Sequence, residues 1–381
     1  MSEFCRFVPN ATCPDLWHYL QGQRHRPILL YGMGDGADKV LAVCAEYGIP
    51  IADVFASDGF VRGQCFHGRR VLTFSEARET YGDENMISLL CFGSSRPEVL
   101  ETIRRTASLC ELYLPDVPVS GGVLFSAELV DSCRERISRA REVLADEQSR
   151  EVLDGVIRAR LSGRLEDVEA TASAREEVWI DILSAADIRT AADLGAYTGD
   201  SLRELSRHAP QLTDVLCMEP DQRSFRKLVR YAEGSALQGV RVHPLQAAAW
   251  SSDTALTFHD TGNRNATLLD VPQSRERLRE VYARSLDSAW GEIRDSLPQS
   301  RLDFIKYDVE GAEWEALLGS REVIREYHPR LLVSVYHKST DLWELPLLVR
   351  ELYPEAALYL RRMAGVPTWD IELYAVPQGD A

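Results

Sequence analysis

The stretch Asp193-Leu-Gly-Ala-Tyr-Thr-Gly199 is the most informative part of this 381-residue sequence. It follows the short, mainly apolar stretch 188–192 and precedes a helical pattern that begins at Ser201. An acidic residue at the end of a strand, followed by two glycines four positions apart, allows a ligand to lie against bare backbone. The spacing differs from the G-x-G-x-x-G pattern of dinucleotide sites, and it suits a ligand with one ribose, an adenine and an amino-acid tail.

A second acidic strand end follows. Residues 215–218 are a strand pattern, and Glu219 comes 20 positions after Gly199. In an α/β unit, an acidic residue at this place can accept hydrogen bonds from ribose hydroxyls. The alternative is an ordinary solvated glutamate before a loop. Together, the Asp193 turn and Glu219 favour S-adenosylmethionine as the ligand.

The composition is that of a globular protein. Hydrophobic residues make up 45% and charged residues 27%, and the length predicts two domains. The net charge of −16 argues against nucleic acid or an anionic membrane as the main partner. No apolar run is long enough to span a bilayer, and the eight cysteines include no CxxC pair. We therefore expect a cytoplasmic protein with free thiols, in which Cys65-Phe-His67 is structural.

Strand and helix patterns alternate over the first third of the chain. This alternation predicts a Rossmann-like α/β domain over residues 1–118. Its turn, Gly32-Met-Gly34-Asp-Gly36, departs from the dinucleotide pattern, and Asp53 and Asp58 are candidates for a ribose contact. A nucleotide or nucleotide-sugar could bind here, or the sheet could be purely structural. Residues 119–177 read as a helical connector whose charged residues form solvated faces.

Residues 178–381 predict a second, larger α/β domain. Gln246 and Ala247 follow its third strand, where Gln246 could bond an adenine edge beside small residues, although a polar loop is as good an explanation. Residues 261–300 form a polar excursion with two helical patterns, the expected cover of the acceptor site. Asn265 and Thr267 are its candidate substrate contacts. The predicted strands of this domain are residues 188–194, 214–218, 240–245, 304–307, 330–336 and 371–376.

A cluster of carboxylates follows the central strand of this domain. Asp308, Glu310 and Glu313 lie within six residues, and they cannot all be buried without partners. Some must meet donors, which could be the ammonium group of the cofactor, a lysine or a metal. Lys306 alternates with Asp308, so an internal ion pair between these two is the simpler alternative. His337 follows another strand end, where a histidine is well placed as a general base.

These motifs resemble the FkbM family of S-adenosylmethionine-dependent methyltransferases, over about residues 180–377. The resemblance implies a class I, seven-stranded sheet with an antiparallel last strand, and O-methyl transfer to a sugar or secondary metabolite. Tyr197 departs from the family pattern, since many members carry Asn at this position. The motifs that carry the resemblance are Asp193 to Gly199, Met218-Glu-Pro220, Phe304 to Glu313, Val335-Tyr-His-Lys338 and Leu373-Tyr-Ala-Val-Pro377.

The resemblance also implies roles for single residues. Asp193, Gly195 and Gly199, with Ala196 between the glycines, would contact the methionine part of the cofactor. Glu219 would contact its ribose. Asp308 and Glu310 would border the transferred methyl group and the substrate. Lys338 is a further candidate substrate contact.

We expect transfer of the activated methyl group to a hydroxyl of a small polar acceptor. His337 would take the proton, and Asp308 would orient the imidazole or the acceptor. No resident metal is expected, although Asp308, Glu310 and His337 could hold one. Two other classes stay open: a nucleotide-dependent oxidoreductase acting through the amino-terminal sheet, and a non-catalytic nucleotide-binding protein. A homo-oligomer is compatible with the sequence.

Overall fold

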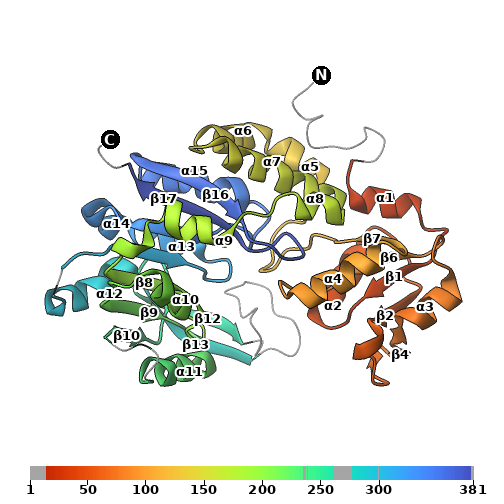
Figure 1. Cartoon of the computed structure of the whole chain (residues 1–381), viewed down its shortest axis with the longest axis horizontal. Coiled ribbons are helices and arrows are strands. Elements are labelled where there is room, and N and C mark those ends of the chain that lie inside the picture. Colours follow the sequence, from red (N-terminus) through yellow and green to blue (C-terminus); the bar gives the residue numbers. More distant parts are fainter. Residues whose placement is uncertain (1–13, 235–236, 238, 261–276, 299, 379–381) are drawn as a thin grey trace.

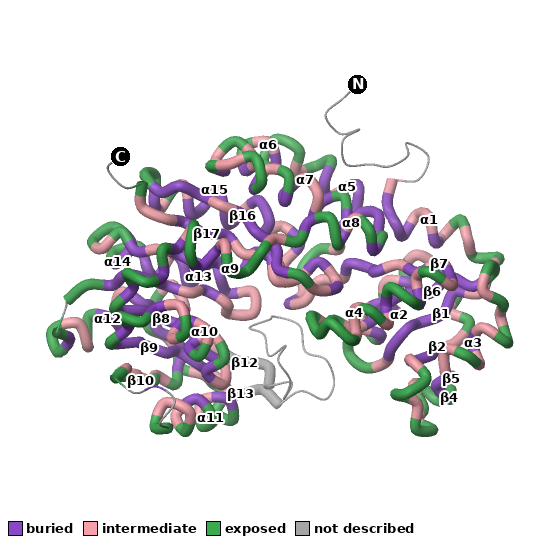
Figure 2. Tube along the Cα trace, in the orientation of Figure 1, coloured by how far each residue is buried: buried purple, intermediate pink, exposed green. Residues whose placement is uncertain are grey.

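The computed structural model describes residues 14–234, 237, 239–260, 277–298 and 300–378. They form two large sheets that are flanked and joined by helices (Figure 1). The expected α/β class is therefore confirmed. Buried residues follow the strands of both sheets, and exposed residues gather on the outer helices (Figure 2). None of the described helices is long and apolar enough to cross a membrane.

The first sheet is parallel throughout. Its central strand, Ile28–Tyr31, is an apolar run that is buried along its whole length, as is typical of parallel sheets covered by helices. The strand order is β5 (Leu72–Thr73), β2 (Asp53–Ala56), β1 (Ile28–Tyr31), β6 (Ile87–Leu90) and β7 (Glu111–Tyr113). Around it lie helices α1 (Leu16–Gly22), α2 (Asp35–Glu46), α3 (Phe74–Tyr81) and α4 (Pro97–Ala107), and the hairpin of β3 (Cys65–Phe66) and β4 (Arg69–Arg70).

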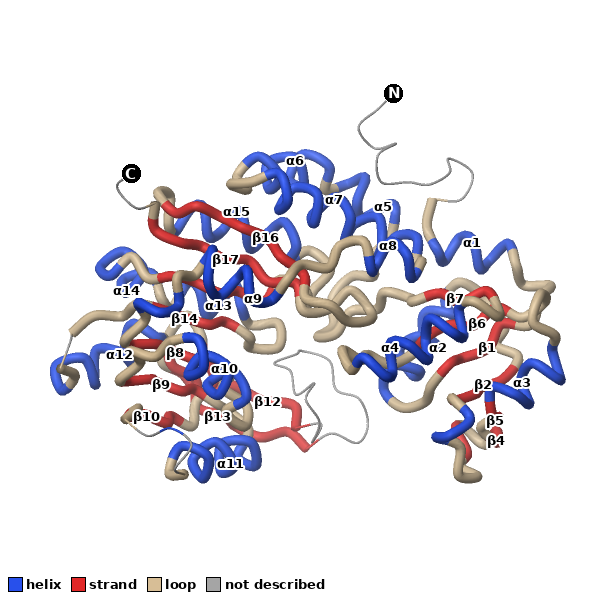
Figure 3. Tube along the Cα trace, in the orientation of Figure 1, coloured by secondary structure: helices blue, strands red, loops and turns tan. Residues whose placement is uncertain are grey.

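The second sheet has seven strands. β17 runs antiparallel to both of its neighbours, β15 and β16, and the other pairs are parallel. Figure 3 shows its strands as a red layer with helices packed against it. The strand order is β10 (Arg241–Leu245), β9 (Asp214–Met218), β8 (Thr190–Leu194), β14 (Phe304–Tyr307), β15 (Arg330–Ser334), β17 (Ile371–Pro377) and β16 (Ala356–Arg362). Its helices are α10 (Asp200–His208), α11 (Gln222–Ala232), α13 (Glu313–Leu318), α14 (Arg321–Tyr327) and α15 (Asp341–Leu352).

The connector between the sheets covers an edge of the second one. The backbone N–H of Ala145 donates to the carbonyl of Leu358 (2.8 Å), and that of Leu360 donates to Ser149 Oγ (2.9 Å). These bonds satisfy polar groups of the edge strand β16 that would otherwise be unpaired. The connector comprises helices α5 (Ala127–Ser132), α6 (Arg134–Glu142), α7 (Glu147–Ser162), α8 (Leu165–Glu169) and α9 (Arg175–Glu177), followed by a π-helical turn, Val178–Ile182.

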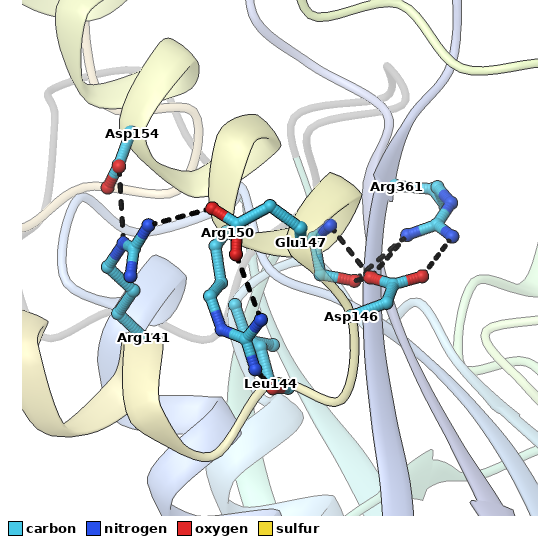
Figure 4. A network of polar contacts seen from close by, with 8 residues as sticks. Arg141, Leu144, Asp146, Glu147, Arg150, Asp154 and Arg361 are labelled. Atoms are coloured by element: carbon cyan, nitrogen blue, oxygen red, sulfur yellow. Dashed lines mark hydrogen bonds and ion pairs between the residues drawn. The ribbon is translucent and has the colours of Figure 1, made fainter.

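Charged residues of the connector join this contact. Asp146 forms an ion pair with the buried Arg361 of β16 (2.7 Å), and Arg141 bridges Glu147 and Asp154 at 3.2 Å each (Figure 4). The expectation that the charges form solvated faces is therefore wrong at Asp146. The sequence pattern of the connector could not indicate this, because the partner Arg361 lies about two hundred positions further along the chain.

The polar excursion also differs from its prediction. Residues 261–276 lie outside the described part, and so do Asn265 and Thr267. Instead of two helices alone, the described remainder contains strand β13 (Arg277–Arg284), which pairs with β12 (Thr254–Asp260) and β11 (Ala248–Ala249), and then helix α12 (Leu286–Ile293). Backbone pairing with β12 holds β13, so its sequence needs no apolar run.

The two halves of the chain are in direct contact. The hydroxyl of Thr368 donates to Asp116 (3.3 Å), and the hydroxyl of Ser339 donates to the carbonyl of Val123 (2.7 Å). Gly93, in the loop after β6, faces the indole of Trp369, and a Cβ at Gly93 would lie 2.4 Å from that ring. The amino-terminal half therefore packs against the turn between β16 and β17.

Candidate functional site

The predicted site residues leave the sheet at neighbouring strand ends. β8 pairs with β9 on one side and with β14 on the other, with Leu194 opposite both Met218 and Tyr307. All three strands are parallel, so Gly195, Glu219 and Asp308 emerge at the same edge. This is the edge at which open parallel sheets place their ligands.

A cavity of about 1010 Å³ opens at this edge. Its volume is at the upper end of the range for small-molecule sites, roughly 300–1,000 Å³, which leaves room for two small molecules side by side. Of its ionisable side chains, eight are acidic and four are basic: Asp200, Glu204, Glu219, Asp221, Asp308, Glu310, Asp370 and Glu372 against Arg175, Arg223, Lys227 and Lys306. The electrostatic field inside it favours a cationic guest.

The turn after β8 forms one wall. Gly195 has a φ of +82°, and a Cβ there would lie 1.9 Å from the carbonyl oxygen of Asp308. Glycine is therefore required at this position because the backbone of Asp308 lies so close, and a ligand bound against this turn would add to that requirement. Tyr197 also lines the cavity, with a φ of +46°. Ala196 is buried, and Gly199 leads into α10; neither is among the residues that line the cavity.

Glu219 is held rigidly at the end of β9. Its two carboxylate oxygens accept hydrogen bonds from the backbone N–H groups of Tyr197 and Asp221, both at 2.8 Å. The side chain lines the cavity although the residue is only 6% exposed. Burial raises the pKa of Glu219 to about 7, with smaller contributions from Asp221 and Asp193, and the two backbone bonds oppose that rise. Each oxygen still has a lone pair for a further donor.

Lys306 links two of the predicted carboxylates. Its Nζ lies 3.0 Å from Asp308 Oδ2 and 3.7 Å from Asp193 Oδ1. The simpler alternative of a Lys306–Asp308 pair is thus present in the structure. Burial would raise the pKa of Asp308, but Lys306 and His337 outweigh it and hold that pKa below its usual value.

Asp193 is buried and is not among the residues that line the cavity. It is 3% exposed and accepts a hydrogen bond from the hydroxyl of Ser201 at 2.6 Å. Burial raises its pKa, and Lys306 opposes that rise. In the described residues, Asp193 therefore anchors the start of α10 and forms an ion pair with Lys306.

His337 is buried among carboxylates. The residue is 1% exposed and is not one of the lining residues. Its Nδ1 lies 2.9 Å from Glu313 Oε1, and its Nε2 lies 3.5 Å from Glu310 Oε2 and 3.6 Å from Asp308 Oδ1. Burial opposes the charged imidazole, but Glu313, Glu310 and Asp308 outweigh it and raise the pKa of His337 to about 10.

This environment argues against the expected base role of His337. At neutral pH an imidazole with a pKa near 10 carries its second proton and cannot accept another. The strand-end position was a sound reason for the expectation, since β15 ends at Ser334, close to the cavity edge. What the position did not reveal is that three acidic side chains converge on the ring.

Glu313 fixes the turn that carries Asp308 and Glu310. It is 1% exposed, and its Oε1 accepts hydrogen bonds from the backbone N–H groups of Val309 (2.9 Å) and Gly311 (3.4 Å). The same oxygen contacts His337. The Asp308–Glu310 turn and the imidazole are thus held by one buried carboxylate.

The remaining predicted contacts lie away from the cavity wall. Gln246 is exposed and Ala247 is buried, and neither is among the lining residues. Their neighbours Ala248 and Ala249 line the cavity instead. The backbone N–H of Lys338 donates to Asp341 at 2.8 Å, and Lys338 is likewise not a lining residue.

Several lining residues were missed because they come from distant elements. Nε and Nη2 of Arg175, the first residue of α9, donate to the two carboxylate oxygens of Glu204 in α10. Asp370, with a φ of +53°, and Glu372 come from the end of the β16–β17 turn and the start of β17. A glutamate between Ile371 and Leu373 was a usable signal, since a charged residue is unusual within so apolar a strand. Ser95, from the amino-terminal half, and Ser173, Met363 and Ala364 also line the cavity.

The glycine turn after β1 offers a poor nucleotide site. Asp53 begins β2, so it lies at the edge of the parallel sheet opposite that turn. Asp58 accepts bonds from the backbone N–H (3.0 Å) and hydroxyl (2.7 Å) of Ser75. Asp35 and Asp38 occupy the first turn of α2, where their charges oppose a phosphate. The alternative of nucleotide binding at this sheet is not supported by this geometry.

No group of three or more His, Cys, Asp or Glu side chains in the described residues has the arrangement of a metal site. Asp308, Glu310 and His337 are among these residues, so they do not have that arrangement either. Their shortest contacts between nitrogen and oxygen are those of ion pairs, and Lys306 already neutralises one of the carboxylates.

Comparison with known proteins agrees with this geometry. The model of the methyltransferase FkbM domain matches residues 193–364. The crystal structure of methyltransferase FkbM from Methylobacillus flagellatus KT has a TM-score of 0.66 and 20% sequence identity, covering 98% of this chain and 95% of that one. The fold is therefore shared over both halves of the chain. No curated protein matches the sequence.

Two further solved structures are similar over part of this chain. An rRNA methylase from Streptococcus thermophilus aligns at a TM-score of 0.34 and 9% identity, covering 54% of this chain and 97% of its own. An O-methyltransferase from Bacillus cereus in complex with SAH aligns at a TM-score of 0.34 and 14% identity, covering 65% of this chain and 100% of its own. Likeness this distant carries no argument about activity. The family match leads to one conclusion: residues 193–364 form a methyltransferase domain of the FkbM family.

Proposed function

We propose that the protein transfers a methyl group from S-adenosylmethionine to a hydroxyl group of a small polar acceptor, within residues 178–381. The observation that carries the proposal is the acidic cavity at the carboxyl ends of β8, β9 and β14. S-adenosylmethionine has a sulfonium, an ammonium and one carboxylate, so it is a net cation and suits such a lining.

The chain's own residues fit this cofactor. Glu219, fixed by two backbone bonds, has free lone pairs for the ribose hydroxyls. The backbone of the turn at Gly195 lies open for the amino-acid tail, and Asp308 follows the adjacent strand end. When bound, the cofactor supplies an electrophilic methyl carbon, and the protein's part is to align the acceptor and to exclude water.

The acceptor would occupy the part of the cavity beside Glu310 and Asp370. Carboxylates accept hydrogen bonds from hydroxyls, and the neighbouring Ser95 and Ser173 both donate and accept. Met363 and Ala364 offer an apolar surface for the carbon skeleton. These features support a hydroxylated acceptor of the size of a sugar or a secondary metabolite.

Calorimetry with S-adenosylmethionine and its demethylated product tests the cofactor site directly. Glu219→Gln should weaken binding about 10- to 100-fold, because a bond to a charged acceptor is lost. The matched control is Glu101→Gln, since Glu101 is exposed on α4 and should leave binding unchanged. A wild-type protein that binds neither compound would remove the proposal.

Transfer to oxygen needs a second experiment. Labelled S-adenosylmethionine is incubated with a panel of hydroxylated and amine-bearing compounds, and the methylated product is located by mass spectrometry. We expect the label on a hydroxyl oxygen. Label on nitrogen only would retain the methyltransferase and overturn the O-methyl assignment.

A further inference from the structure

Glu310 faces the cavity, and its backbone has an unusual conformation. It lies in the turn between β14 and α13 with a φ of +55°, a region that residues with a side chain rarely adopt. Its side chain is 33% exposed and lines the cavity. The turn is imposed by Glu313, which accepts the N–H groups on both sides of Glu310. The carboxylate is therefore held where an acceptor would bind.

His337 and Asp308, the other two candidates for accepting the proton, already contact charged neighbours. His337 is 1% exposed, and both ring nitrogens face carboxylates. Asp308 is paired with Lys306 at 3.0 Å, and that ion pair keeps its pKa below the usual value. Among the described members of the cluster, Glu310 combines access to the cavity with the absence of a neutralising lysine.

We propose that Glu310 is the catalytic base of methyl transfer, and that His337 is a positioning residue, a buried imidazolium that holds Asp308 and Glu310 at the cavity wall. This inference rests on the proposed function. It exchanges the roles that the sequence suggested, since Glu310 was expected to bind substrate and His337 to take the proton.

The proton balance of the step is simple. The acceptor oxygen forms a bond to the methyl carbon while the carbon–sulfur bond breaks, and that electron pair stays on the sulfur. The hydroxyl proton moves to the Glu310 carboxylate, which becomes a neutral acid and later releases the proton to water. Neither oxidant nor metal is needed. His337 keeps both of its protons throughout.

The surroundings of Glu310 set its basicity. Burial raises the pKa of Glu310 to about 7; the charges of Asp308 and Glu313 add to the rise, and His337 and Lys306 oppose it. A base with a pKa close to the working pH is the most effective kind. Other ionisable groups near the cluster come from the neighbouring elements: Tyr336 after β15, Lys338 beside Gly311, Asp341 at the start of α15, and Asp370 before β17.

The test compares variants at both positions, using labelled S-adenosylmethionine and the compound with the highest turnover in the acceptor panel. Glu310→Gln should lower kcat on the order of 10²–10⁴-fold, with calorimetric binding of S-adenosylmethionine retained. Glu310→Asp keeps a carboxylate and should recover part of the rate. The control Glu101→Gln should behave as the wild type.

His337→Gln gives a different signature. Removing the imidazolium raises the pKa of Glu310, so the acidic limb of the pH–rate profile should move upward by about 1–3 pH units. Above that limb the variant should regain much of its rate, which a merely structural residue would not do. If His337 were the base, His337→Gln would be inactive at every pH and Glu310→Gln would remain active. That pair of results would overturn the proposal.

A measurement without turnover separates this inference from the proposed function. In the full-length protein, nitrogen NMR of labelled histidine should show the His337 ring doubly protonated at pH 8.5, with assignment by comparison with His337→Gln. A neutral ring at that pH would overturn the imidazolium role even in a protein that methylates an acceptor. Conversely, a doubly protonated ring in a protein that binds no S-adenosylmethionine would leave the cluster chemistry intact and remove the methyl-transfer proposal.

Discussion

Ser94 and Val366 exchange two backbone hydrogen bonds, from Ser94 N to Val366 O at 2.8 Å and from Val366 N to Ser94 O at 3.0 Å. Ser94 belongs to the loop after β6 of the first sheet, and Val366 belongs to the turn between β16 and β17 of the second. The turn carries Met363 and Ala364 and leads to Asp370, all of which line the cavity. The amino-terminal half therefore fixes the wall at which we place the acceptor.

The contact between Gly93 and Trp369 gives the first prediction. In Gly93→Leu the Cβ would meet the indole at 2.4 Å, so the turn must move. We expect a destabilisation of about 1–3 kcal/mol and a raised KM for the acceptor, with S-adenosylmethionine affinity unchanged. Urea-induced unfolding, acceptor kinetics and calorimetry measure these effects. Gly59→Ala is the control, since a Cβ there meets nothing within 4 Å; an unaltered acceptor KM in Gly93→Leu would show that the turn does not shape the site.

Gly195→Ala tests the turn after β8. Its Cβ would lie 1.9 Å from the carbonyl oxygen of Asp308, which is backbone and cannot swing away. We expect β8 and β14 to separate at this end, with weaker binding of S-adenosylmethionine and lower stability. The matched control is Gly82→Ala, because Gly82 has a similar φ, +77°, and no neighbour within 4 Å. Equal losses in both variants, measured by calorimetry and unfolding, would assign the effect to backbone strain alone.

Lys306→Met removes the cation between two buried carboxylates. At pH 8 we expect a loss of about 3–5 kcal/mol, because Asp193 and Asp308 are left without their common partner. The deficit should shrink toward pH 5, since the carboxylates then take up protons and lose their charge. Urea-induced unfolding at both values measures it, with Lys227→Met on the exposed face of α11 as the control. A deficit that is the same at both pH values would contradict the assignment.

The Asp146–Arg361 pair predicts a pH-dependent stability of the connector. Burial would raise the pKa of Asp146, but Arg361 and Ser149 outweigh it and lower that pKa. A lowered folded-state pKa stabilises the fold above the unfolded value, about 3.9, and this contribution disappears as the pH falls. Asp146→Asn should therefore cost about 1–3 kcal/mol at pH 7 and much less at pH 3. Asp131→Asn, at an exposed helical pair, should cost little at either pH.

The sequence indicated the parts of the site that depend on local order along the chain. Gly195, Glu219 and Asp308 each follow an apolar strand directly, and parallel pairing of three such strands is enough to bring them together. The protonation of His337 depends on Glu313, which reaches the ring from another element. The wall residues Arg175, Asp370 and Ser95 depend on how the halves dock. A pattern of spacings contains no information of that kind.

The amino-terminal sheet also shows how a small shift in a strand boundary changes which edge of the sheet a residue lies on. Asp53 could contact a ribose only if it lay at the carboxyl end of its strand, but β2 begins at Asp53. The side chain then belongs to the opposite rim, where it accepts a bond from the hydroxyl of Tyr81 (3.2 Å). The error lies in the element boundary, which sequence patterns determine poorly.

The contribution of Ser95 to the cavity has a practical consequence. Shortening the gene to express only the catalytic module would leave one side of the acceptor chamber open to water, and would free the turn that Val366 pins in place. Such a fragment would be expected to retain cofactor affinity while accepting the wrong molecules or none. Searches for the natural acceptor should therefore use the intact polypeptide.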